Sequence, residues 1–68
     1  MSSNAAVQSK ALTILTEQMN MELAAYKKAS HYAQTFEEPA LKTLASTVAT
    51  HHKTRFDKLS TYLSSHAN

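Results

Sequence analysis

The chain of 68 residues contains no glycine and a single proline, Pro39. Because glycine is the residue that takes positive φ at little cost, a chain without it has few places for a tight turn. Good helix formers, among them alanine, leucine, methionine, glutamate, glutamine and lysine, dominate the long segment before the proline. The sequence therefore predicts two long helices and one connection.

The expected boundaries follow from residues that suit helix ends. Ser3 and Asn4 have side-chain oxygens that can accept the unpaired N–H groups of a first helical turn. Pro39 suits the first position of a second helix, where its missing N–H is not needed. The predicted single domain is a helical hairpin over residues 1–68, with a first helix over 4–35, a turn at 36–38 and a second helix over 39–64.

Apolar residues recur along both predicted helices at steps of three and four, the spacing of an a/d heptad seam. The first seam contains Leu12, Leu15, Met19, Glu22, Tyr26, Ala29, Ala33 and Phe36, and the second contains Leu41, Ala45, Ala49, His52, Phe56, Leu59 and Leu63. When the chain folds back at the turn, facing residues have numbers that add to 74 or 75. The two polar exceptions among these apolar and aromatic residues, Glu22 and His52, obey this rule, so we expect them to face each other.

A second apolar stripe lies beside each seam. Its members are Val7, Ala11, Ile14, Met21, Ala25 and Tyr32 in the first helix, and Leu44, Val48 and Tyr62 in the second. A chain this small, without cysteine for disulfides, needs a partner or a metal to complete a core. Burying one leucine-sized side chain contributes roughly 1.5–3 kcal/mol. The predicted fold class is all-α: a two-helix antiparallel hairpin that forms a homodimeric four-helix bundle.

Glu22 and His52 are the candidate site residues. A carboxylate in an apolar interior is costly unless it is paired, and imidazole can serve as its hydrogen-bonding partner or as a fellow metal ligand. One interpretation is a polar layer that fixes register, supported by a hydrogen bond from Tyr26 one turn later. The other is a metal site for Fe, Mn or Zn. Ala49 stands where a Glu-x-x-His motif ending at His52 needs glutamate, which argues against a ferroxidase-type centre.

Several function classes are excluded by composition and pattern. The net charge is only +2, and the basic residues are spread along the chain, so we expect no nucleic-acid partner. No apolar run approaches the roughly 18 residues of a membrane span, and the N-terminal residues do not resemble a secretory signal. No phosphate loop or catalytic motif is present. We expect a protein that is not an enzyme, has no membrane partner and is cytoplasmic when made.

A set of short helical motifs also carries a family resemblance. It consists of Glu22, Tyr26-Lys27-Lys28, His31-Tyr32-Ala33, Glu38-Pro39-Ala40-Leu41-Lys42, His51-His52, Phe56 and Leu59. These motifs, over roughly residues 16–63, resemble small ferritin-like proteins related to the coat F proteins of the spore coat. More distantly, the segment around Glu22 is similar to the first helix of ferritins, where the glutamate is a metal ligand. The resemblance implies a ferritin-like hairpin and association with a spore coat, and it does not imply iron storage.

Three hypotheses follow from these observations. The leading one is a structural or assembly protein of the spore-coat type that acts as a homodimer and meets coat or other proteins. The rival is a ferritin-like protein that binds Fe, Mn or Zn through Glu22 and His52. The third is a helical adaptor whose second stripe docks a different protein.

Overall fold

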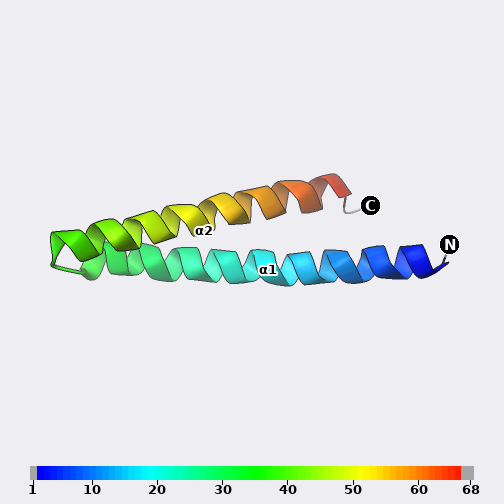
Figure 1. Cartoon of the computed structure of the whole chain (residues 1–68), viewed down its shortest axis with the longest axis horizontal. Helices are drawn as coiled ribbons and strands as arrows, with labels where there is room; N and C mark the ends of the chain where they lie inside the picture. Colours follow the sequence, from blue (N-terminus) through cyan, green and yellow to red (C-terminus); the bar gives the residue numbers. More distant parts are fainter. Residues whose placement is uncertain (1, 67–68) are drawn as a thin grey trace.

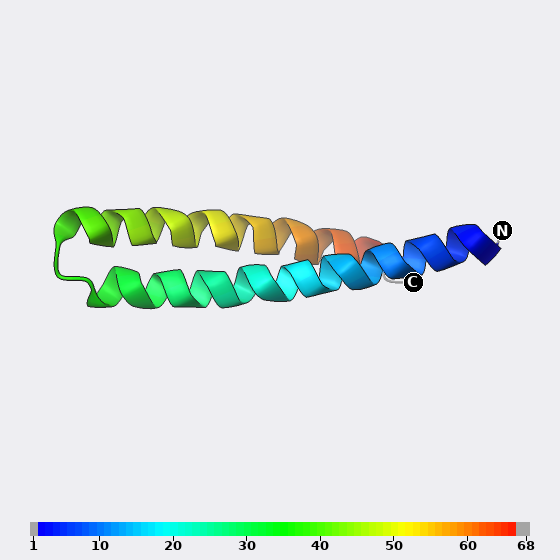
Figure 2. The ribbon, with the colours of Figure 1, turned by 60° about the horizontal axis from the view of Figure 1, so that its bottom comes forward.

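The computed structural model describes residues 2–66, with side chains from residue 5 onward, as two antiparallel helices joined by a short turn (Figure 1). Helix α1 spans Ser2–Thr35 and helix α2 spans Pro39–His66. Figures 1 and 2 both show the N-terminal part of α1 projecting past the end of α2. The prediction of an all-α hairpin is confirmed, and the other half of a four-helix bundle would have to come from another chain.

The outer ends of both helices differ from the expected ones. α1 begins at Ser2, so the backbone of Ser3 and Asn4 is already helical and neither residue caps the helix where we expected it. The side chains of these two residues lie outside the described part of the chain. α2 continues beyond residue 64 to His66, because no glycine or proline interrupts the helix there.

The turn closes without any residue at positive φ in the described part of the chain. The amide of Phe36 still donates to the carbonyl of Tyr32 at 2.8 Å, and the amide of Lys42 donates to the carbonyl of Glu38 at 3.0 Å. The Lys42 ammonium then reaches back to the end of α1 and donates to the carbonyls of Phe36 at 2.9 Å and Gln34 at 3.3 Å. One lysine thus satisfies helix-end carbonyls that a glycine-based cap commonly satisfies.

The hairpin is a rod with extents of 56 × 15 × 12 Å and a radius of gyration of 15.9 Å. A compact domain of this length would have a radius of gyration of about 11 Å. The smallest extent is about the diameter of one helix with its side chains, so the seam between the helices opens to solvent on both faces. Among the described residues the buried apolar side chains are those of Ala29, Ala45 and Ala49. The larger seam residues remain partly exposed.

The two open faces of the rod differ in chemistry. On one face, both helices line a shared groove. The groove contains residues that follow a seam residue by one position: Ser30, Gln34, Ser46, Thr50 and Lys53. Because one residue step turns a helix by about 100°, residues that precede a seam residue by one position lie on the opposite face. The groove is therefore polar, and the second apolar stripe occupies the other side of the rod.

That other side, which we call the apolar face, presents seven exposed large hydrophobic side chains. They are Val7, Ile14, Met21 and Tyr32 on α1, and Leu44, Val48 and Tyr62 on α2. Their exposed fractions run from 41% for Tyr32 to 66% for Val7. The seam residue Leu41, near the turn, is itself 40% exposed. A single hairpin thus leaves the second stripe uncovered.

Replacing Lys42 with methionine should destabilise the hairpin, because the apolar stem is kept while the two carbonyls at the end of α1 lose their donor. We expect the free energy of unfolding to fall by about 1 kcal/mol, the usual size of one partly exposed hydrogen-bonded group. Urea unfolding followed by circular dichroism measures this change. The matched control is Lys27→Met on the outer surface of α1. Equal stability of the two variants would contradict a capping role for Lys42.

Candidate functional site

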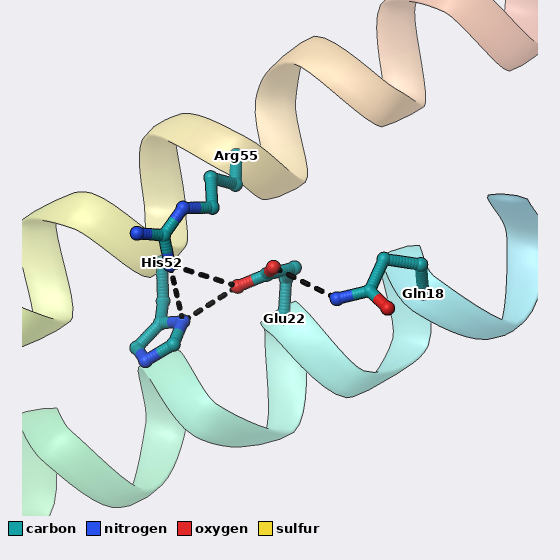
Figure 3. Close-up of polar contacts among 4 residues, drawn as sticks. All are labelled: Gln18, Glu22, His52 and Arg55. Carbon is teal, nitrogen blue, oxygen red and sulfur yellow. Dashed lines mark hydrogen bonds and ion pairs between the residues drawn. The ribbon is translucent and has the colours of Figure 1, made fainter.

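The two polar seam residues meet near the middle of the hairpin. Nδ1 of His52 on α2 lies 2.5 Å from Oε1 of Glu22 on α1 (Figure 3). Glu22 is 7% exposed and is the buried charged residue of the described chain. Because an ionised carboxylate can only accept, Nδ1 of His52 carries the proton and donates it to this bond. The contact has the register that the heptad seams predict.

Two further side chains complete the cluster, and sequence reasoning missed both. Nε2 of Gln18 donates to Oε2 of Glu22 at 3.0 Å, and Nη1 of Arg55 lies 3.7 Å from Oε1 (Figure 3). Nη1 of Arg55 is also 3.5 Å from Nδ1 of His52, but both nitrogens are donors when His52 donates to Glu22. Helical spacing contained the signal: Gln18 lies four residues before Glu22, and Arg55 lies three after His52.

Tyr26, which we expected to support Glu22, makes no hydrogen bond to it in the described part of the chain. Tyr26 instead lines the polar groove together with Lys53. The reason is helical geometry, since a residue four positions later is rotated by about 40° to one side and a residue four positions earlier by about 40° to the other. Gln18 lies on the side toward the apolar face and takes the role expected of Tyr26.

The cluster keeps the carboxylate ionised. The hydrogen bond from His52, then that from Gln18, lowers the pKa of Glu22 below its ordinary value of 4.5, and the nearby charge of Arg55 acts in the same direction. Burial opposes these effects without reversing them. Three side chains thus compensate the removal of one carboxylate from water.

The contact between Glu22 and His52 is a hydrogen bond in geometry and does not fit metal coordination by both groups. Metal–ligand bonds of about 2.0–2.2 Å at tetrahedral angles place two ligand atoms roughly 3.3 Å apart. The observed separation of 2.5 Å between Nδ1 and Oε1 is too small for an ion between them. Among the described residues, no three His, Asp or Glu side chains come together as a metal site. In this arrangement one hairpin offers Nε2 of His52 as a ligand, with Glu22 orienting the imidazole.

Comparisons with known proteins leave the resemblance at the level of sequence motifs. A scan against protein-family models and searches of curated proteins and of solved structures give no match to this chain. Neither described helix is long and apolar enough to cross a membrane. The relationship to coat F proteins and ferritins therefore stays a prediction.

The difference in stability between wild type and Glu22→Gln should depend on pH. Because the pKa of Glu22 is lowered by folding, the ionised carboxylate stabilises the hairpin above its ordinary pKa. This stabilisation is lost as the pH falls through the lower pKa of the folded state. We expect wild type to be the more stable protein at neutral pH and the difference to shrink as the pH falls below the ordinary pKa of Glu22 and through its lower value in the folded state. Urea unfolding at a series of pH values measures it.

The matched control for this series is Glu17→Gln, which removes an exposed carboxylate from the same helix. Its stability should follow that of wild type at every pH. A Glu22→Gln difference that is constant from neutral to acidic pH would contradict a stabilising ionised Glu22.

Proposed function

We propose that the chain is a non-enzymatic helical assembly protein that acts as a homodimer, with two hairpins forming a ferritin-like four-helix bundle. The observation that carries this proposal is the apolar face. Its seven large side chains are 41–66% exposed on one side of a rod whose buried apolar side chains, among the described residues, are alanines. A set of large exposed apolar side chains on one face of such a chain is typical of a protein–protein contact.

A second copy would supply the core that one hairpin lacks. Covering each half-exposed side chain of the apolar face contributes roughly 1 kcal/mol. Seven such contributions are comparable with the net stability of a small folded protein, about 5–15 kcal/mol. Because both copies present the same face, a two-fold axis covers both faces at once.

The cluster around Glu22 supports a structural role for the polar seam residues. Both carboxylate oxygens are occupied, Oε1 by His52 and Oε2 by Gln18. Every buried side-chain nitrogen or oxygen in the described residues has a hydrogen-bond partner. Sliding one helix by a turn would leave Glu22 buried without His52, so the pair penalises other registers.

The spore-coat setting is supported by the motifs over roughly residues 16–63. In this setting the dimer is made in the cytoplasm and joins a coat, where coat or other proteins are its further partners. The polar grooves would point outward in a dimer that pairs through its apolar faces. They are the surfaces that remain for such contacts.

The homodimer is tested by measuring the molecular mass of wild type and of two variants. One variant carries a new carboxylate on the apolar face, and the other carries it in the polar groove. Light scattering should give wild type about twice the chain mass of 7.5 kDa at micromolar concentration. Leu44→Glu puts a carboxylate on the apolar face and should produce a monomer with reduced helicity, because burying an unpaired charge is costly. Thr50→Glu adds the same charge in the polar groove and should leave the dimer intact. A folded wild-type monomer at this concentration would overturn the proposal.

A second candidate function, binding of Fe, Mn or Zn, is favoured by one observation. The hydrogen bond from Nδ1 of His52 to Glu22 orients the imidazole as in carboxylate–histidine–metal sites, with Nε2 on the far side of the ring (Figure 3). A homodimer would contain two such imidazoles.

Thermal unfolding with and without each metal separates the two functions. A ligand that binds only the folded state raises the melting temperature. With a purely structural polar layer, we expect no metal-dependent shift in wild type. A shift in wild type and in His51→Gln that disappears in His52→Gln would instead identify His52 as a ligand and favour the metal-binding function. The two variants remove neighbouring imidazoles and so form a matched pair.

A further inference from the structure

The apolar face changes its character along α2. Between Val48 and Tyr62, the positions that precede seam residues are His51, Arg55 and Lys58, and all three are exposed. The ends of this helix face are therefore apolar, and its middle is basic.

The same height on α1 has a different chemistry. Gln18 and Met21 occupy the apolar face there, and the carboxylate of Glu22 lies beside them at the edge of the seam. Arg55 extends from α2 toward this carboxylate, and its side chain is 55% exposed. The middle of the apolar face thus has cations on α2 and the nearest anion on α1.

Two hairpins can cover their apolar faces in two ways that keep all neighbouring helices antiparallel. With the turns at opposite ends, α1 packs on α1 of the partner and α2 on α2. With the turns at the same end, α1 of each copy packs on α2 of the other. The charges of the face distinguish these two arrangements.

Turns at opposite ends leave the cations without a counter-ion. The midpoint of α2, which spans Pro39–His66, falls between residues 52 and 53, so with full overlap the facing residues of two α2 helices have numbers that add to about 105. Arg55 would then lie opposite His51 of the partner, and Lys58 opposite Val48. No carboxylate on the described apolar face of α2 would meet either cation.

Turns at the same end bring complementary groups together. Facing residues then lie at about the same height, as they do within one hairpin, so their numbers add to about 75. Pairs of the apolar faces come close to this sum: Ile14 lies near Tyr62, and Tyr32 lies near Leu44. Met21 meets Arg55, whose alkyl stem can pack on the thioether while the guanidinium reaches the neighbouring carboxylate.

We propose that two copies pair through their apolar faces with both turns at the same end, and that Arg55 of each copy binds Glu22 of its partner. This inference rests on the proposed homodimer and adds its orientation and its central ion pairs. Arg55 already lies 3.7 Å from Glu22 of its own chain. Its guanidinium has five N–H donors, enough to serve both carboxylates of a shared polar layer.

A distance between two spin labels tests the orientation directly. The chain has no cysteine, so Glu37→Cys carries one nitroxide at the turn of each copy. Turns at the same end should give about 15–30 Å, because bundle helices lie roughly 10 Å apart. Turns at opposite ends should give more than about 40 Å, since an intervening helix rises about 1.5 Å per residue. A label at Asn20→Cys, near the middle of the rod, is the control and should give a short distance in both arrangements.

Arg55→Ala provides a second readout that depends on the orientation. Turns at the same end predict a dimer dissociation constant raised about 100-fold, because each of the two symmetry-related Arg55–Glu22 contacts contributes about ten-fold. Turns at opposite ends predict a constant that is not raised, because Arg55 then has no carboxylate across the interface. Lys53→Ala removes the same charge from the groove side and should change little.

The outcomes separate this inference from the homodimer itself. A monomer by light scattering overturns both. A dimer with a long Glu37 distance, or one that Arg55→Ala does not weaken, overturns the orientation and leaves the homodimer standing. A short distance with a weakened Arg55→Ala dimer supports the inference.

Discussion

Two antiparallel helices cannot enclose a volume, and the rest of this structure depends on that constraint. The rod is 12 Å across at its thinnest, so every seam residue is close to solvent on two sides. Among the described residues only alanines and one carboxylate become buried, because small side chains can withdraw between helices that lie close together. Larger apolar residues stay partly exposed. The apolar face is thus a large uncovered part of the hairpin.

The cluster around Glu22 connects the fold of one chain to its assembly. Within the hairpin, the carboxylate joins α1 to α2 through His52 and is supported by Gln18 on its own helix. Arg55 reaches the same carboxylate from the exposed edge of the apolar face. The buried anion that joins the two helices is therefore also the nearest counter-ion for the exposed basic residues of the apolar face.

The connection between the helices shows how a chain without glycine reverses direction. Lys42 bonds back to carbonyls at the end of α1, so the first turn of α2 closes the last turn of α1. The turn and the Glu22–His52 contact hold the same relative height of the two helices from two separate places along the rod. This agreement explains why one register is favoured although the seam contains mainly small or half-buried residues.

The sequence by itself determined the two helices, the place of the turn, the residues of the seams and the meeting of Glu22 with His52. Heptad spacing and a single break suffice for this, because backbone periodicity fixes which residues share a helix face. The tertiary structure decided the rest. It places Gln18, and not Tyr26, in hydrogen-bond contact with the carboxylate of Glu22. It also places Arg55 at the edge of the cluster and leaves the side chain of Leu41 exposed. Long side chains reach in several directions from one backbone position, and only the rotation and closeness of the neighbouring helix select among them.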